Sequence, residues 1–299
     1  MSKGFRVVEA VLRNDEHLVF NLTVLSELNK RKLLNSFEAS VTLCNLYSTH
    51  LSFLQNIPSK GTKAEGRYLF LTGSWLILWK CLFLPGKKVI IFHNFYAFLD
   101  SKKMHNRIKI LGYKILIKFG RVQATVLDAY IESNIGKKLK MNHKVLQLAY
   151  SPDIVSSFSK GCRSTDKIDK AIFGNLFPGK LDAHHLQNLA PVHLGKLHGG
   201  LNYVNSIDRY LDISEYYSLL RAVDKVCILN SSNHRVASGV FADAVLLEKI
   251  AICLKDDYIN YVAKKFDINL SNNGEYCEVD LSPLQEKFYG KFLNDLERL

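Results

Sequence analysis

Short apolar runs rich in β-branched residues alternate along the chain with longer segments whose apolar residues recur at helical spacing. Residues 87–92 and 250–254 are typical of buried strands. Residues 17–30 have apolar residues at helical spacing, and residues 105–120 predict a basic amphipathic helix. Further strand-like runs are residues 5–12, 37–44, 122–128, 143–150, 170–175, 191–196 and 224–232. Because parallel strands need long crossover connections, this alternation predicts βαβ units and an α/β fold.

One polar stretch, residues 151–169, interrupts the alternation and is rich in Ser, Asp, Lys and Gly, as linkers are. The alternation of strand-like and helix-like segments restarts after it. We therefore expect two Rossmann-like, doubly wound domains that face a cleft, over residues 1–150 and 170–280. Residues 281–299 predict an amphipathic helix that could pack back on the first domain.

The cysteine pattern and the first residues bear on the environment of the chain. The 6 cysteines are scattered and form no CxxC pair, so we expect reduced thiols and a cytoplasmic protein. Charges at Arg13, Asp15 and Glu16 break the first apolar run, which argues against a signal peptide. Residues 68–86 are strongly apolar, but Lys80 interrupts them, so we expect a buried or interface-lying helix rather than a membrane span.

Positive charge is concentrated in the first half of the chain. Residues 1–150 contain 23 Lys and Arg but 9 Asp and Glu, a net charge of +14, whereas the remainder carries −2. This asymmetry predicts that one half meets an anionic partner, which is either nucleic acid or an acidic membrane leaflet. A solvated basic surface is the alternative interpretation.

A turn glycine follows the first strand-like run after the polar stretch. In the segment AIFGNLFPGK, Gly174 ends the strand, Asn175 follows it, and Lys180 lies before the next helix. Ligands of open α/β sheets bind at the carboxyl ends of strands, beside helix N-termini. Gly174 and Asn175 are therefore candidate ligand-binding residues, and Lys180 is a candidate phosphate contact. A turn glycine after a strand also has a purely structural explanation.

A second small-residue turn lies between residues 224–232 and the helix-like segment that follows. At Ser238 and Gly239 we expect a helix N-terminus, whose first backbone N–H groups would be unpaired and would carry the positive end of the helix dipole. This arrangement predicts a diphosphate cradle, to which Arg235 adds charge. Asp243, one turn into the helix, could accept hydrogen bonds from sugar or ribose hydroxyls. The alternative is an ordinary helix start with an acid in its first turn.

The segment 212–253 resembles the C-terminal half of GT-B glycosyltransferases, where a strand, a Ser/Gly-rich turn, a helix with an acid–Ala pair and a short strand follow one another. The resemblance implies that the second domain binds a nucleotide-sugar donor and that no metal cofactor is required. It places Ser238 and Gly239 in the diphosphate turn and Asp243 at the acid that bonds the donor ribose. Gly174 matches the loop glycine after the first strand of that domain.

Candidates for a catalytic base lie in the first half. The strand that ends at His93 is similar to a strand of the same family, and the resemblance implies that His93 faces the cleft. Asp15 and His17 lie at a strand-to-helix junction, where either could take the proton of an acceptor hydroxyl. The alternatives are a core histidine at position 93 and a helix-capping cluster around Asp15. Neither HExxH nor another His or Cys set at ligand spacing is present, so we expect no metal site.

The leading interpretation is a glycosyltransferase that moves a sugar from a nucleotide-sugar to a lipid-linked saccharide in bacterial surface-polysaccharide assembly. The basic first half, with residues 105–120, Trp75 and Trp79, would rest on the inner face of the cytoplasmic membrane. A nucleotide-sugar 2-epimerase shares the architecture but leaves the basic half unexplained. The third interpretation is a non-enzymatic, basic α/β protein that binds nucleic acid. We expect no nucleic-acid partner, because no RNA-binding motif or zinc finger is present.

Overall fold

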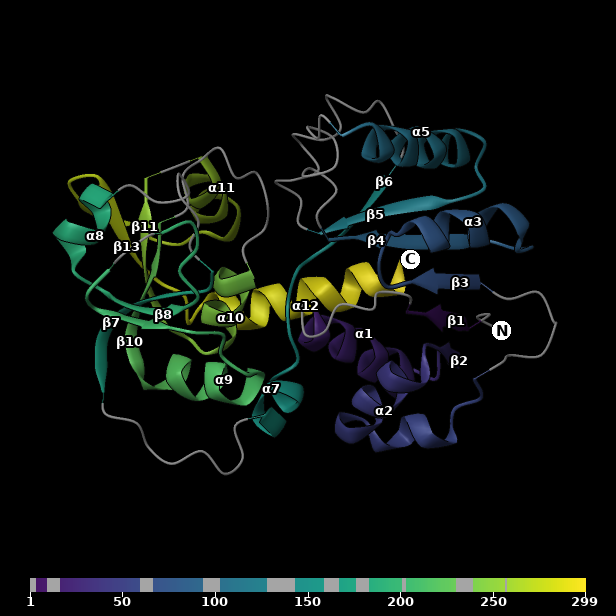
Figure 1. The fold of residues 1–299 in the computed structure, drawn as a ribbon, viewed down its shortest axis with the longest axis horizontal. Helices are drawn as coiled ribbons and strands as arrows, with labels where there is room; N and C mark the ends of the chain where they lie inside the picture. Colours follow the sequence, from purple (N-terminus) through teal and green to yellow (C-terminus); the bar gives the residue numbers. More distant parts are fainter. Residues whose placement is uncertain are drawn as a thin grey trace. The chain divides into compact units, whose positions relative to one another are not determined.

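The computed structural model describes residues 4–9, 17–59, 67–93, 103–127, 143–158, 167–175, 183–200, 203–229, 239–255 and 257–299. Figure 1 shows an α/β protein whose sheets are rich in parallel strands, which is compatible with Rossmann-like folds. The chain divides into two compact units. Unit 1 comprises Met1–Leu148 with Lys291–Leu299, and unit 2 comprises Ala149–Gly290.

Unit 1 contains a 6-stranded sheet in which neighbouring strands are parallel. The spatial order is β2-β1-β3-β4-β5-β6, so the direction of winding reverses between β1 and β3. The strands are β1 (Phe5–Val8), β2 (Leu34–Glu38), β3 (Arg67–Phe70), β4 (Lys88–Phe92), β5 (Gln123–Leu127) and β6 (His143–Leu146). The helices are α1 (Leu18–Lys30), α2 (Val41–His50), the 3-10 helix η1 (Ser52–Asn56), α3 (Trp75–Phe83) and α5 (Met104–Lys118).

Several elements of unit 1 form as the sequence predicts. Strand β4 is buried along its whole length, as expected for an apolar run of a parallel sheet. Ser40 and Ser74 begin α2 and α3, because their hydroxyl oxygens accept hydrogen bonds from the N–H groups of Leu43 and Ile77, each at 3.3 Å. These serines therefore set where the two helices start.

The end of helix α12 (Leu284–Glu297) contributes to unit 1. The buried Phe292 ring lies edge-on to the ring of Phe20 in α1, with 6.1 Å between the ring centroids. The buried Asp295 carboxylate accepts a hydrogen bond from the Gln147 N–H at 3.1 Å and pairs with Lys291 at 2.9 Å. Residues 291–299 thus supply part of the core of the unit that also contains β1.

Unit 2 contains a 7-stranded sheet in the order β12-β13-β11-β10-β7-β8-β9. Strands β7 to β11 are parallel, and β12 and β13 add an antiparallel edge. The strands are β7 (Ile168–Phe173), β8 (Val192–Gly195), β9 (Ser206–Asp208), β10 (Val223–Ile228), β11 (Ile250–Leu254), β12 (Ser271–Asn273) and β13 (Tyr276–Asp280). The helices are α7 (Pro152–Phe158), α8 (Ala183–Leu189), α9 (Ile213–Ala222), α10 (Gly239–Leu246), α11 (Asp257–Phe266) and the larger part of α12.

The strand predicted over residues 37–44 is wrong. Strand β2 ends at Glu38 and helix α2 begins at Val41. The alternating apolar pattern crosses this boundary, but the cap at Ser40 starts a helix within it.

Two further segments differ from the expectation. Residues 68–86 do not form a single helix, because β3 and α3 share this stretch. The polar stretch 151–169 contains helix α7, and its residues 159–166 lie outside the described part. Among the described helices, none has both the length and the apolar character needed to cross a bilayer.

Candidate functional site

The sheet of unit 2 reverses its winding between β7 and β10, because β8 and β9 lie on one side of β7 while β10 and β11 lie on the other. In open α/β sheets, ligands bind at the carboxyl ends of the strands that flank this reversal. Gly174 directly follows β7, and Gly239 begins the helix after β10. Gly174 and Gly239 thus follow the two strands that flank this reversal, and the rest of the second glycine turn lies outside the described residues.

The backbone at Gly174 is open on one side and fixed on the other. Its φ of +99° favours glycine, and a Cβ placed there would meet no described atom within 4 Å. Its N–H donates to the Leu194 carbonyl at 3.0 Å. Gly195 lies against it so closely that a Cβ at position 195 would be 2.3 Å from the Gly174 carbonyl oxygen. Asn175, which follows, is exposed.

His193, which lies in β8, holds the loop after β7 in place. Its Nε2 lies 3.0 Å from the Gly174 carbonyl oxygen, and its Nδ1 lies 2.8 Å from the Ser206 hydroxyl. A carbonyl can only accept, so Nε2 carries the proton and Nδ1 accepts from Ser206. Burial lowers the pKa of His193, although the hydrogen bond to Gly174 opposes this effect. A neutral imidazole therefore fixes Gly174.

The start of helix α10 is accessible at Gly239. This residue is exposed, and a Cβ placed on it would meet only the Tyr150 hydroxyl among the described atoms, at 3.6 Å. The N–H groups of the first helical turn lack partners within the helix and carry the positive end of its dipole. Gly239 therefore lies where an anion could approach the backbone. Lys180, Arg235 and Ser238 lie outside the described residues.

Asp243 is buried and bonded to two tyrosines. Its Oδ2 accepts a hydrogen bond from the Tyr216 hydroxyl at 2.8 Å, and its Oδ1 accepts one from the Tyr217 hydroxyl at 2.6 Å. Burial raises the pKa of Asp243 to about 6, while the two tyrosine hydrogen bonds act in the opposite direction. The carboxylate thus joins α10 to α9. A ribose hydroxyl would have to share oxygens that already accept from tyrosines.

The three tyrosines around Asp243 were not among the residues singled out from the sequence. Tyr150 lies beside Gly239, and the ring of Tyr216 lies edge-on to Phe173 at the end of β7, with 5.3 Å between centroids. Burial and the Asp243 charge raise the pKa of Tyr150, Tyr216 and Tyr217 well above the ordinary value. All three therefore remain hydroxyl donors at neutral pH.

The structure brings together two catalytic candidates of unit 1, His17 and His93. Their rings stack with 3.8 Å between centroids and 21° between planes. His17 precedes α1 with a φ of 78°, and His93 follows β4. The His93 Nε2 lies 2.9 Å from the Leu71 carbonyl oxygen, so Nε2 carries the proton and Nδ1 carries the lone pair. Asp15 lies outside the described residues.

His93 is held in the neutral state. Burial lowers the pKa of His93 well below its ordinary value, and the charge of a protonated His17 would lower it further. The hydrogen bond to the Leu71 carbonyl opposes these two effects. Nδ1 is therefore unprotonated at neutral pH and can accept a proton, although a pKa this far below the operating pH makes His93 a weaker base than an ordinary histidine.

A buried carboxylate, Glu9, lies at the switch point of unit 1 and was missed in the sequence. It directly follows β1, and its oxygens accept hydrogen bonds from the Asn21 amide at 2.7 Å and the Thr72 hydroxyl at 3.1 Å. Asn21 also donates to the Tyr47 hydroxyl at 3.0 Å. Thr72 follows β3, so this network joins the ends of the two strands between which the winding reverses. The signal for this site in the sequence was an acidic residue, Glu9, directly after the apolar strand β1.

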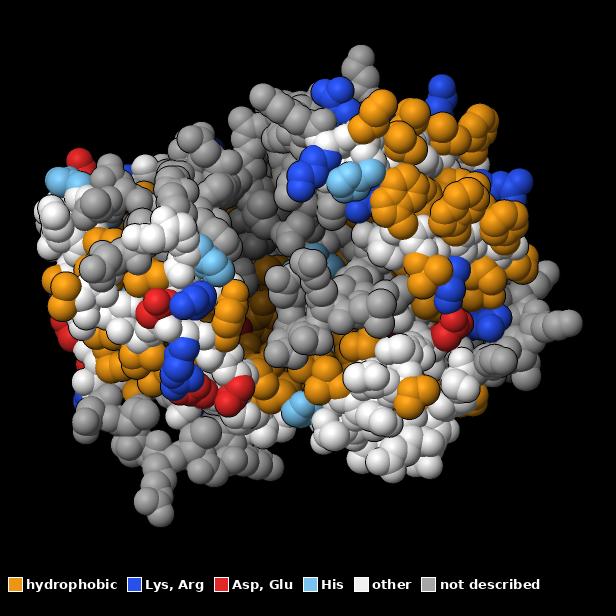
Figure 2. Space-filling model, in the orientation of Figure 1, with side chains coloured by type: hydrophobic (Ala, Val, Ile, Leu, Met, Phe, Trp, Pro, Cys, Tyr) orange, Lys and Arg blue, Asp and Glu red, His pale blue; other side chains and the backbone are white. Residues whose placement is uncertain are grey.

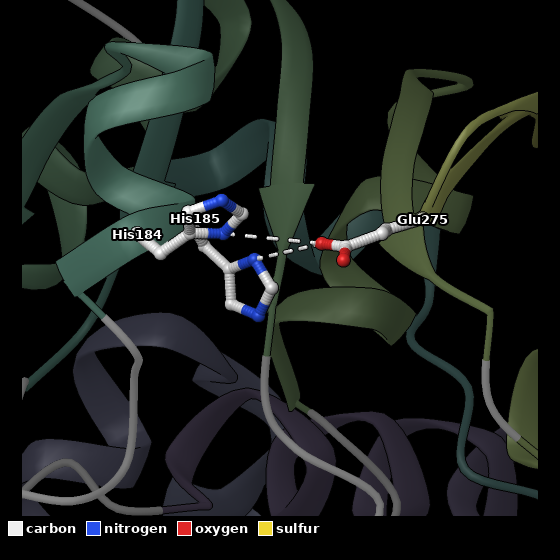
Figure 3. A group of neighbouring side chains, drawn as sticks. All are labelled: His184, His185 and Glu275. Atoms are coloured by element: carbon white, nitrogen blue, oxygen red, sulfur yellow. Dashed lines mark ion pairs between the residues drawn. The ribbon is translucent and has the colours of Figure 1, made fainter.

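One group of described side chains has ligand atoms close enough to hold a metal ion. It consists of His184, His185 and Glu275 in unit 2 (Figure 3). The sequence led us to expect no metal site, because it contains neither HExxH nor another His or Cys set at ligand spacing, and Glu275 is far along the chain from the two adjacent histidines. None of the residues predicted to bind the donor belongs to this group.

Comparison with known proteins adds no relative. No protein-family model matches the chain, and no curated protein has a significantly similar sequence. Function can therefore be inferred only from strand order, glycine geometry and the side chains at the strand ends.

Proposed function

We propose that this protein is a GT-B glycosyltransferase whose second unit binds a nucleotide-sugar donor at the β7–β10 switch point. The observation that carries the proposal is the position of Gly174 and Gly239, which follow the two strands at which the winding reverses. A Cβ placed at Gly174 would meet no described atom within 4 Å, and one placed at Gly239 would meet only the Tyr150 hydroxyl, at 3.6 Å. The arrangement of the two units around a cleft is part of this proposal.

The diphosphate of the donor binds at the start of α10. Backbone N–H groups near Gly239 donate to the phosphate oxygens, and the helix dipole stabilises the negative charge that develops on the leaving diphosphate. Lys180 and Arg235 add positive charge, and Ser238 adds a hydroxyl donor. Asp243 and its tyrosines support α10 and contact the ribose, and Gly174 and Asn175 form the opposite wall. No step of this transfer requires a metal ion.

A base in unit 1 removes the proton of the acceptor hydroxyl. His93 is the first candidate, because the hydrogen bond of Nε2 to the Leu71 carbonyl leaves Nδ1 as the proton acceptor, beside His17. Asp15 is the second candidate. Glu9, with both oxygens bonded to neighbouring side chains, positions the strand ends rather than accepting the proton.

The acceptor is a lipid-linked saccharide, and the protein works on the inner face of the cytoplasmic membrane. Helices α3 and α5 pack against one another: a Cβ placed on Gly112 would lie 2.9 Å from Leu78, and the Tyr113 hydroxyl donates to the Ser74 carbonyl at 2.6 Å. Large apolar side chains of both helices nevertheless face outward. They are Trp75, Leu76, Trp79, Leu82, Phe83, Met104, Ile108, Leu111 and Ile115, and Phe119 follows them.

We call these residues the apolar face of unit 1. Figure 2 shows it as a continuous hydrophobic area at the upper right, over α3 and α5. Neither helix contains an acidic residue. Exposed lysines and arginines lie in α5 or close to α3 and α5 in the chain, namely Lys87, Lys103, Arg107, Lys118 and Arg121. Apolar side chains flanked by cations are typical of helices that lie in the interface of an anionic membrane.

Two other functions remain open. A nucleotide-sugar 2-epimerase would use the same donor site but would not need the apolar face. A nucleic-acid-binding protein would use the basic residues but would not need glycine turns at a switch point. The apolar face favours the transferase, because neither alternative accounts for exposed tryptophans beside cations.

A thermal-shift panel with UDP, GDP, CMP and their sugars tests the proposal directly. We expect one nucleotide class to raise the melting temperature, as any ligand that binds only the folded state does. Sedimentation with anionic and with neutral vesicles is measured in parallel. Protection without vesicle binding would favour the epimerase, and salt-sensitive RNA binding without protection would favour the third function.

A further inference from the structure

Three potential metal ligands meet in unit 2 from two separate elements. His184 and His185 lie in the first turn of α8, and Glu275 lies in the turn between β12 and β13 (Figure 3). The Glu275 Oε2 is 3.9 Å from the Nδ1 of His184 and 4.0 Å from the Nδ1 of His185. One ligand atom from each residue lies within 4.8 Å of the others.

The backbone beneath these side chains is fixed by packing. Leu186 and Leu189 of α8 pack, together with Tyr276, on a buried cluster from three neighbouring strands of the sheet. Tyr276 pairs with Leu254, the last residue of β11, so Glu275 lies at the carboxyl edge of the sheet. The start of α8 lies at the same edge, because this helix connects the carboxyl end of β7 to β8.

Tyr276 also orients one of the imidazoles. Its hydroxyl lies 2.8 Å from the Nδ1 of His185, and the two rings are edge-on with 5.6 Å between centroids. A metal ion on Nε2 of His185 would keep this contact as the outer-shell hydrogen bond that ligating histidines usually have, whereas an ion on Nδ1 would replace it. The side chains of His184 and Glu275 are 56% and 64% exposed, so small rotations can close the ligand set.

We propose that His184, His185 and Glu275 form a binding site for a divalent transition-metal ion of the Zn²⁺ type. Two imidazoles and one carboxylate are a recurrent three-residue ligand set for Zn²⁺, with water in the remaining position. Imidazole ligands select such ions over Mg²⁺ and Ca²⁺, which prefer oxygen. The ion ties the start of α8 to the β12–β13 turn. None of the three ligands is among the residues proposed to bind the donor, and the proposed sugar transfer needs no metal.

The test is a titration of the full-length chain, freed of any histidine tag and stripped by a chelator, with Zn²⁺ alone. A chromophoric competitor reports the affinity. We expect a single tight ion for the wild type and an affinity weaker by about tenfold or more for His184→Ala and for Glu275→Gln, because each loses a ligand. His105→Ala removes an exposed histidine of α5 and is the matched control with unchanged affinity.

Two readouts make the result decisive. Zn²⁺ should raise the melting temperature of the wild type and of His105→Ala but not of His184→Ala, because only a native site shifts unfolding. Mg²⁺ at the same concentration should not compete. Equal Zn²⁺ affinity in the wild type and in a variant carrying both His184→Ala and Glu275→Gln would overturn the proposal. No nucleotide is present, so this outcome is independent of whether the protein is a glycosyltransferase.

Discussion

The imidazole rings of His17 and His93 stack at 3.8 Å, although one residue precedes a helix and the other follows a strand. The hydrogen bond from His93 Nε2 to the Leu71 carbonyl leaves Nδ1 as the acceptor. If His93 is the base, His93→Gln should lower kcat by about 10²- to 10⁴-fold while nucleotide protection stays unchanged. Transfer assays with a matched His50→Gln control in α2 measure this. Unchanged kcat in His93→Gln would move the role to Asp15.

The buried histidines predict how stability changes with acid. Burial lowers the pKa of both His93 and His193, so the unfolded chain binds their protons more readily than the folded chain. Their contribution to stability is therefore complete above the unfolded pKa of about 6.5 and declines as the pH falls below it. Urea unfolding between pH 8 and pH 5 should show a falling free energy. His193→Gln, which cannot gain a charge, should show a smaller decline than the wild type.

The hydrogen bond from Tyr217 to Asp243 should contribute more to stability at high pH than at low pH, because Asp243 is charged only above its raised pKa. Removing the hydroxyl in Tyr217→Phe leaves a buried carboxylate with one donor fewer, which should destabilise the fold by about 1–3 kcal/mol at pH 8. The Asp243 pKa of about 6 is above its unfolded value, so the cost of the buried charge is present above pH 6 and disappears as the pH falls toward 4. The loss in Tyr217→Phe should therefore be smaller at pH 5. Tyr210→Phe, at an exposed position, is the control and should lose almost nothing.

A substitution at Gly239, the first residue of α10, should abolish nucleotide binding without unfolding the protein. Gly239→Val adds a branched side chain where the phosphates are proposed to bind, while the first added carbon meets only the Tyr150 hydroxyl at 3.6 Å. Nucleotide protection in the thermal-shift assay should disappear, and the melting temperature without nucleotide should change little. Gly290→Ala in α12, where a Cβ meets no described atom within 4 Å, is the control that keeps protection. Full protection in Gly239→Val would place the diphosphate elsewhere.

If the apolar face binds the membrane, replacing its exposed aromatic residues by acidic ones should abolish that binding. Trp79 and Phe83 are 56% and 78% exposed, so Trp79→Glu with Phe83→Glu should not disturb the core. The double variant should lose most of its sedimentation with anionic vesicles, because a carboxylate resists burial at the acyl boundary and is repelled by anionic lipid. Val204→Glu, at a residue 98% exposed in unit 2, should sediment like the wild type. Equal sedimentation of all three proteins would refute the membrane proposal.

Patterns of nearby residues in the sequence correctly predicted the helices and strands that form from local preferences. The apolar run of β4 and the periodic helix α1 were both predictable, and so were the positions of Gly174 and Gly239 after their strands. The strand predicted at residues 37–44 failed because its alternation spans a strand end and a helix start. The role of the two glycines in binding a donor remains a prediction.

The buried polar clusters could not be predicted from local patterns. Glu9 bonds to Thr72 and Asn21, and Asp243 to Tyr216, across intervals that no periodicity covers. The same holds for the contact between His184 and Glu275. For Glu9 and Thr72 the strand order brings the partners together, because β1 and β3 are neighbours, and the strand order is a property of the complete sheet.

Helix α12 has a practical consequence for anyone who wishes to study the halves separately. A fragment that stops at residue 148 would lack Phe292 against Phe20 and the Asp295 carboxylate that receives the Gln147 N–H. Such a fragment would expose the apolar surface around Phe20 and leave the Gln147 N–H without its carboxylate acceptor. We therefore expect it to aggregate during purification. Residues 291–299, supplied as a separate peptide or joined to the fragment through a short glycine linker, should restore these contacts and keep the fragment soluble.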